Sequence, residues 1–174
     1  MKAKIALMLA LASSLSFVAC SDDDDDDDAV SQIVTSATDY TGTTTASVMG
    51  VEVPMENDVL TVAPMEKDAN YAQITLAARE LSFGPIAVTM DAFTIDSLTC
   101  TGTADDYALT RAKAFSIEGI NVSLAGQESA QVISGTFDGA TLKDGVLKVS
   151  LSGVKAHEAM AALTISMSFE GQKK

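Results

Sequence analysis

The C-terminal part of the chain alternates between apolar and polar residues with a period of two. Residues 147–152 and 163–170 each fit a strand with one apolar and one polar side. The side chains expected on the inner side are Leu147, Val149, Leu151, Leu163, Ile165, Met167 and Phe169. Asp144-Gly145, just before the first of these strands, supplies residues that tolerate positive φ in a tight hairpin turn. The pattern therefore predicts two half-buried strands, the first entered through a hairpin.

Weaker alternation extends back to residue 40. We expect strands in residues 40–53, around residues 60–62, and in residues 71–83, 86–95, 107–117 and 131–142. Two of these patterns change phase, near Arg79 and at Phe93, as they would across a bulge that bends a strand. With the two C-terminal strands this makes about eight, a spacing typical of a barrel or sandwich. Residues 156–162 hint at helix, and we expect a helical turn or a loop there.

The predicted fold class is all-β: a single antiparallel up-and-down barrel of about eight strands, in one domain that spans residues 38–174. A barrel of eight strands is the size at which side chains just fill the interior or leave room for one small ligand. The open question is therefore whether this barrel is filled or hollow.

The N-terminus has the three parts of a secretory leader. Lys2 and Lys4 supply positive charge, an apolar stretch follows, and small residues precede Cys20. Residues 17–20, Phe-Val-Ala-Cys, resemble the lipobox of bacterial lipoproteins, in which a peptidase cuts before a cysteine that already carries diacylglycerol. The resemblance implies that residues 1–19 are a removed signal peptide and that Cys20 is the site of lipid attachment. The alternative is an ordinary secreted protein with an incidental cysteine.

An acidic run follows Cys20 directly. It consists of Ser21 and then Asp22, Asp23, Asp24, Asp25, Asp26, Asp27 and Asp28. This run resembles the export signal of surface lipoproteins in the Bacteroidota, which implies an outer-membrane anchor and a domain that faces the cell exterior. A solvated spacer is a second interpretation, because like charges repel and stay extended, and a weak calcium-binding run is a third. Residues 20–37 are expected to form a disordered tether.

Three segments of the predicted domain resemble the calycin-like, or lipocalin-like, β-barrel domains of Bacteroidota lipoproteins. They are residues 40–42 (Tyr-Thr-Gly), residues 135–137 (Gly-Thr-Phe) leading to residues 143–145 (Lys-Asp-Gly), and residues 165–171 (Ile-Ser-Met-Ser-Phe-Glu-Gly). The likeness covers residues 38–171 and implies the barrel fold. The chain has no Trp, so the Gly-x-Trp signature of typical lipocalins is missing and no ligand-binding residues follow from the resemblance.

Composition narrows the classes of function. Of 174 residues 47% are apolar, an ordinary proportion for a globular protein. The chain has 24 acidic and 11 basic residues. An acidic surface repels nucleic-acid phosphates and anionic lipid, so no nucleic-acid partner is expected.

Few side chains offer catalytic or metal chemistry. Cys100 has no second cysteine in the domain and is interpreted as a small buried hydrophobe. His157 is the single histidine. A His-rich metal site is therefore excluded, and a Ser-His-Asp triad would depend on this one loop residue. Asp105-Asp106 could be a carboxylate pair for acid–base chemistry, but it follows residues 102–104 (Gly-Thr-Ala) and precedes a strand, so a solvated turn explains it. We therefore expect no enzyme, no catalytic residues, no metal and no cofactor.

Residues 96–98, Asp-Ser-Leu, resemble the short sequon for O-glycosylation in the Bacteroidota, which makes Ser97 a candidate for modification.

Two classes of function are favoured over a hydrolase. The first is a binding module that holds a small apolar or amphipathic ligand, or part of a glycan, in the barrel mouth. The second is a structural or protein-interaction lipoprotein with a filled barrel. Six methionines suit either an adaptable pocket or a packed core: Met49, Met55, Met65, Met90, Met160 and Met167. An apolar cavity of about 300 Å³ or more would favour the first.

Overall fold

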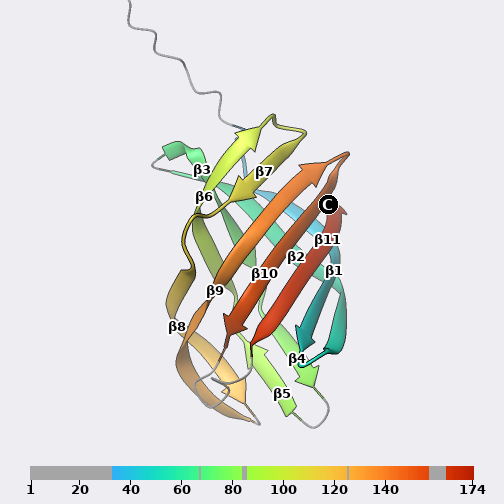
Figure 1. Cartoon of the computed structure of the whole chain (residues 1–174), viewed down its shortest axis with the longest axis vertical. Coiled ribbons are helices and arrows are strands. Elements are labelled where there is room, and N and C mark those ends of the chain that lie inside the picture. Colours follow the sequence, from blue (N-terminus) through green and yellow to red (C-terminus); the bar gives the residue numbers. More distant parts are fainter. Residues whose placement is uncertain (1–32, 67, 84–85, 125, 157–163) are drawn as a thin grey trace, which may run out of the picture.

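The structure is a computed structural model that describes residues 33–66, 68–83, 86–124, 126–156 and 164–174. All of the regular elements in these residues are strands (Figure 1). They are β1 (Thr38–Val48), β2 (Val51–Met65), β3 (Asp68–Leu76), β4 (Arg79–Phe83), β5 (Ile86–Met90), β6 (Phe93–Gly102), β7 (Tyr107–Thr110), β8 (Phe115–Leu124), β9 (Gln127–Lys143), β10 (Val146–Lys155) and β11 (Ile165–Lys173). No helix in the described part of the chain is long and apolar enough to cross a membrane.

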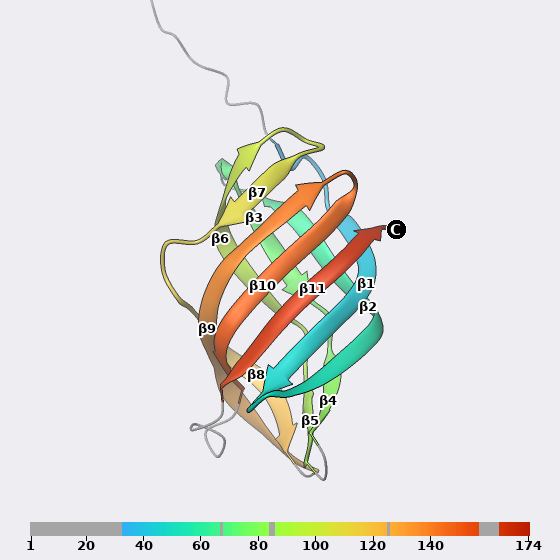
Figure 2. The same ribbon diagram turned by 45° about the vertical axis from the view of Figure 1, so that its right-hand side comes forward.

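Eight of these strands close into an antiparallel barrel. The order around it is β1, β2, β3, β6, β7, β9, β10 and β11, and β11 pairs with β1 to complete the circle. The eight barrel strands follow one another in chain order, with β4 and β5 inserted between β3 and β6 and β8 inserted between β7 and β9, so the barrel is up-and-down. Figure 2 shows the strands tilted across the barrel in this order. The predicted fold class, an all-β antiparallel barrel of eight strands, is confirmed.

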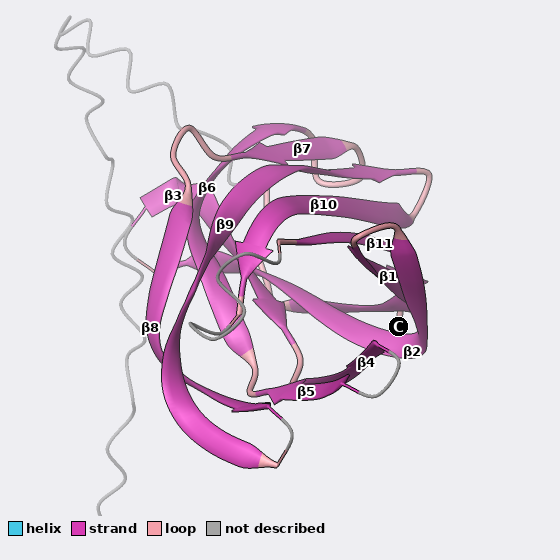
Figure 3. Cartoon of the chain, turned by 60° about the horizontal axis from the view of Figure 1, so that its bottom comes forward, coloured by secondary structure: helices cyan, strands magenta, loops and turns pink. Residues whose placement is uncertain are grey.

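Three of the predicted strands are each divided into two shorter ones. Residues 71–83 become β3 and β4, residues 86–95 become β5 and β6, and residues 107–117 become β7 and β8. One strand of each pair, β3, β6 or β7, stays in the barrel. The other three, β8, β5 and β4, continue in that order from β9 as an extension of the sheet, at the end of the molecule that is lowest in Figure 1 and comes forward in Figure 3. Both predicted changes of phase, near Arg79 and at Phe93, coincide with the start of a new strand.

The first predicted strand, residues 40–53, is wrong as a single element. The chain reverses at Met49-Gly50, where both residues have positive φ, 51° and 81°, and β1 then pairs with β2 as a hairpin. Methionine carries no turn signal, and the apolar side chain of Met49 is 84% exposed. The apolar positions change phase across this turn, from Val48 to Val51, and the prediction missed this change beside Gly50.

The expected inner face of the last two strands is confirmed. The inward residues are nearly or fully buried: Leu147, Val149, Leu151, Ile165, Met167 and Phe169. Leu163, expected to join them, lies outside the described residues. The predicted hairpin turn at Asp144-Gly145 is also confirmed, because both residues have positive φ, 51° and 77°, as a tight hairpin requires.

Side chains fill the centre of the barrel. Between Thr44, Leu60, Leu76, Leu151 and Met167 the residual cavity has a volume of about 10 Å³, which is no more than the space of one water molecule. This central part of the interior is therefore a packed core.

Close backbone contact explains the glycine in the C-terminal motif. Gly171 lies opposite Gly42 in the pairing of β11 with β1. A Cβ atom on Gly171 would overlap the ring of Phe169, and one on Gly42 would overlap the backbone of Glu170. The aromatic ring of Phe169 thus covers Gly171, and the two strands pair closely at a position where neither has a side chain.

The lower end of the barrel contains a seam, which we define as the gap in main-chain pairing between residues 51–58 of β2 and β4. Strand β3 pairs with β2 over residues 60–65, and β4 pairs with β5 on its other side. The free edges carry the kinds of residue that discourage further strand pairing, proline and acidic side chains: Glu52, Pro54, Glu56 and Glu80.

Candidate ligand site at the mouth of the barrel

The upper end of the barrel holds a cavity of about 480 Å³, which we call the mouth cavity. Its walls are the segment that precedes β1, the turn between β6 and β7, and the turn between β9 and β10. In Figure 1 this end also carries the C-terminus. The cavity therefore lies above the packed centre of the barrel.

Two buried tyrosines form part of the floor of the mouth cavity. The hydroxyls of Tyr40 in β1 and Tyr107 in β7 are 3.3 Å apart and share a hydrogen bond, although 67 residues separate them in sequence. The two residues are 3% and 5% exposed. Burial raises the pKa of Tyr107, and its hydrogen bond with Tyr40 raises that pKa further. The floor is therefore an apolar surface, completed by Val62 and Leu142, with one neutral polar pair.

Charged residues surround the mouth cavity at its rim. Asp105, Asp106 and Asp144 belong to turns, and Lys173 ends β11. All four are exposed. The amide of Thr103 donates to the carbonyl of Asp106 at 2.8 Å, so the expected solvated turn at residues 105–106 is confirmed. Sequence reasoning missed that this turn borders a cavity, because strands distant in sequence bring its other walls to it.

The N-terminal segment forms the remaining wall. Val34 is 9% exposed and belongs to the apolar core, and Ile33 is half-buried against it. These residues fall in the part of the sequence expected to be tether. Strand β1 begins at Thr38, but packing against the barrel begins before it, at Ile33 and Val34.

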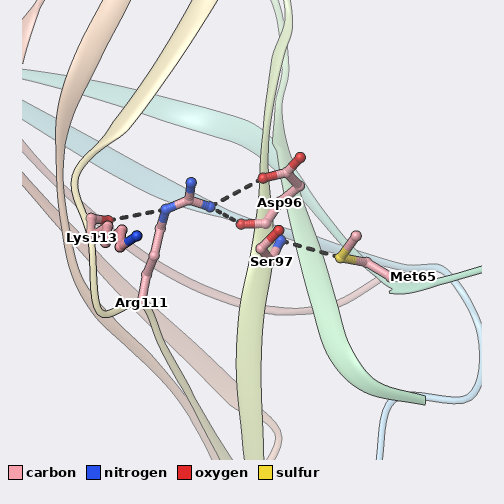
Figure 4. Close-up of polar contacts among 5 residues, drawn as sticks. All are labelled: Met65, Asp96, Ser97, Arg111 and Lys113. Carbon is pink, nitrogen blue, oxygen red and sulfur yellow. Dashed lines mark hydrogen bonds and ion pairs between the residues drawn. The ribbon is translucent and has the colours of Figure 1, made fainter. Parts of the chain in front are cut away.

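The candidate glycosylation residue Ser97 lies on a bulge of β6, on the outside of the barrel (Figure 4). Ser97 has φ of 56° and is exposed. Its amide donates to Sδ of Met65 at 3.2 Å. The preceding carboxylate, Asp96 Oδ1, lies 3.1 Å from Nη1 of Arg111, whose Nε donates to the carbonyl of Lys113. Modification of Ser97 stays a prediction, and the bulge presents its side chain to solvent.

Other residues singled out in the sequence are less informative. Cys100 is a free thiol at intermediate exposure that packs partly against the core. Burial raises the pKa of its thiol, which disfavours the reactive thiolate. His157, Cys20 and residues 21–28 lie outside the described residues, as does Met160 among the methionines. Within the described ranges, no group of three or more His, Cys, Asp or Glu side chains is placed to hold a metal ion.

One polar network inside the barrel had no signal in the sequence. Nη1 of Arg79, at the start of β4, lies 3.1 Å from Oδ2 of Asp58 in β2, and the two side chains are 3% and 10% exposed. Thr44 donates its hydroxyl to the same carboxylate, and Arg79 Nε donates to the carbonyl of Ala77 at 3.1 Å. Burial lowers the pKa of Arg79, and the charge of Asp58 opposes this. The network spans the seam, and its residues become neighbours only when β2 and β4 meet.

Comparison of the chain with protein-family models, with curated proteins and with solved structures finds no match. The fold defines the class of protein, which is a closed antiparallel β-barrel of eight strands with an extension of its sheet at one end. The mouth cavity combines an apolar floor with a charged rim. This arrangement suits noncovalent binding of a small molecule with an apolar body and a polar end.

Proposed function

We propose that this protein is a lipid-anchored, surface-exposed barrel of the calycin-like type that binds a small ligand without catalysis. The ligand is apolar or amphipathic, or is part of a glycan, and its site is the mouth cavity. The observation that carries this proposal is the mouth cavity of about 480 Å³, which falls in the range of about 300–1,000 Å³ typical of small-molecule sites.

The packing of the barrel directs the ligand to its mouth. The space at the centre amounts to about 10 Å³ and holds no ligand larger than water. At the mouth, the apolar parts of Tyr40 and Leu142, which are 3% and 7% exposed, offer contact for a hydrocarbon or sugar face. The carboxylates and Lys173 at the rim offer hydrogen bonds and charge for a polar end.

The leader supports the proposed location. A lipid on Cys20 would lie 13 residues before Ile33 (33 minus 20), and a fully extended chain of that length spans about 45 Å. Ile33 lies at the mouth. The mouth is then the end of the barrel that is connected to the membrane anchor.

A second function, a structural or interaction lipoprotein of the cell envelope, is favoured by one observation. Side chains fill the centre of the barrel and leave a residual space of about 10 Å³ there. In that case the mouth cavity would hold solvent and the outer face of the barrel would meet a partner.

Binding can be tested with Nile red, a neutral amphipathic dye whose emission rises in an apolar site. Ala104 is exposed at the rim of the mouth cavity, and Ala104→Trp should fill part of the cavity and weaken dye binding about tenfold or more. Ala112 is exposed in a loop that does not line the cavity, so Ala112→Trp is the matched control. The parent chain has no Trp, so each variant carries a single one. Absence of dye binding to the parent chain, or equal weakening by both variants, would contradict a ligand site at the mouth.

Anchoring is tested separately by Cys20→Ala and by partition into a detergent phase. We expect the variant to leave the detergent phase, since two or three acyl chains are needed for stable anchoring. Replacement of residues 22–28 by alanine should protect the domain from protease added to intact cells. Membrane association of Cys20→Ala equal to the parent would rule out lipidation, and equal digestion with and without the acidic run would rule out its export role.

A further inference from the structure

The wall of the mouth cavity formed by residues 33–36 differs from the other two walls. We propose that these residues are a displaceable plug: the N-terminal segment and a small apolar ligand compete for the mouth, so that ligand binding releases the segment. This inference rests on the proposed function and adds a mechanism that regulates the same site.

The burial pattern of the segment is that of a single anchored side chain. Val34 is 9% exposed, and Ile33 is half-buried beside it. Thr35, Ser36 and Ala37 are exposed. The segment therefore attaches to the mouth through one apolar contact region, of the same chemistry as the proposed ligand.

Main-chain pairing does not hold this segment to the barrel. Pairing of β1 with β2 begins at Thr38, opposite Val62, and within the described chain residues 33–37 make no hydrogen bond to the barrel. The other walls are closed turns between paired strands, at residues 103–106 and 144–145. Displacing the N-terminal wall therefore requires less free energy than displacing either turn, because only apolar contacts are lost.

Competition has a quantitative consequence. If the mouth is open in a fraction of molecules, the apparent Kd for a ligand is the intrinsic Kd divided by that fraction. A change that weakens the plug should therefore tighten ligand binding, although it removes apolar surface from the site. A residue that contributes directly to the ligand site would have the opposite effect. The sign of the change separates the two roles.

The test compares Val34→Ser with Ala37→Ser in the full chain, with Nile red as the probe. Val34→Ser should lower the Kd for the dye about tenfold, because the buried contact of the plug is largely lost. Ala37→Ser, at an exposed position of the same segment that does not line the cavity, should leave the Kd unchanged. If Val34→Ser is unfolded by circular dichroism, Ile33→Ser replaces it, with a tightening of about threefold expected from its smaller burial.

A second measurement follows the plug without any ligand. Because the chain lacks Trp, Ile33→Trp gives one fluorescent reporter at the mouth. Adding Val34→Ser to Ile33→Trp should increase quenching of this Trp by acrylamide, while adding Ala37→Ser should not.

The outcomes distinguish the plug from the proposed function. Tighter dye binding with greater quenching supports the plug. A Kd that is measurable and equal in the parent and Val34→Ser, or weaker in Val34→Ser, overturns the plug and leaves the ligand site in place. If neither the parent nor Val34→Ser binds the dye, the ligand site and the plug fall together. Unchanged quenching also overturns the plug, since Val34 would then not hold the segment to the mouth.

Discussion

The buried ion pair between Arg79 and Asp58 allows a sharp test of how the seam is held together. Its nitrogen and oxygen atoms are 3.1 Å apart, and the side chains are 3% and 10% exposed. The exposed pair of Lys148 and Glu170 has the same separation, 3.1 Å, with side chains 61% and 63% exposed. The two pairs have equal separation and differ greatly in burial, so the exposed pair serves as a reference for the buried one.

The net contribution of the buried pair to stability is the difference between two opposing contributions, the attraction of the charges and their removal from water. At an effective dielectric constant of 20, two unit charges 3.1 Å apart attract by about 5 kcal/mol. Removing each charge from water costs several kcal/mol, so the intact pair contributes little net stability. Among the described residues, neither terminal nitrogen of Arg79 has a hydrogen bond of good geometry, which further limits the gain. Loss of one partner, however, leaves the other charge buried without compensation.

We therefore expect Arg79→Met to lower the free energy of unfolding by about 3–5 kcal/mol. Asp58→Asn should cost a similar amount, while its remaining carbonyl oxygen can still accept from Thr44. The double variant should lose about as much as one single variant, so the coupling energy equals one single loss, about 3–5 kcal/mol. Lys148→Met should change stability by less than about 1 kcal/mol. Urea unfolding at pH 7, followed by circular dichroism, gives each value.

Two results would refute this reasoning. Equal effects of Arg79→Met and Lys148→Met would show that burial of the pair has no energetic consequence. Additive losses in the double variant would show that Arg79 and Asp58 do not act on each other. A rise in salt concentration provides a further check, because it should weaken the exposed pair much more than the buried one.

Three further predictions concern the core, the mouth and the thiol. Ile165→Asp places a carboxylate at a position that is 1% exposed and should lower the free energy of unfolding by several kcal/mol. Thr164→Asp, at the adjacent exposed position, should leave the melting temperature in thermal unfolding almost unchanged. Equal melting temperatures for the two variants would contradict the inward register. Burial raises the pKa of Tyr107, so above about pH 10 the unfolded chain loses this proton while the folded chain keeps it, and the free energy of unfolding falls as pH rises. Tyr107→Phe should reduce the steepness of that fall by up to about 1.4 kcal/mol per pH unit, measured by urea unfolding at alkaline pH. An unchanged slope would contradict the raised pKa of Tyr107. Because burial raises the pKa of Cys100, iodoacetamide at pH 8 should modify it at least several-fold more slowly in folded protein than in urea, and equal rates would show a freely accessible thiolate.

Several features of the fold could be predicted because they depend on local spacing. Alternation with a period of two assigns Leu147, Val149 and Ile165 to one face of their strands whatever lies opposite, and Asp144-Gly145 selects a tight turn through positive φ. Phase changes at residues 79 and 93 marked where strands break, since a shift of one residue moves each following side chain to the other face. The turn at Met49-Gly50 was missed, although the apolar positions change phase there too, between Val48 and Val51.

The sequence by itself determined an acidic all-β domain with strand faces, several turns and few groups capable of catalysis. The tertiary structure alone decided which residues meet. Tyr40 reaches Tyr107 across 67 residues, Arg79 reaches Asp58 across the seam, and Val34 closes a cavity whose other walls are distant turns. Period and turn chemistry are properties of neighbouring residues, whereas closure of a barrel depends on register between strands far apart in the chain. Cavities and buried ion pairs arise from that closure, so no local pattern encodes them.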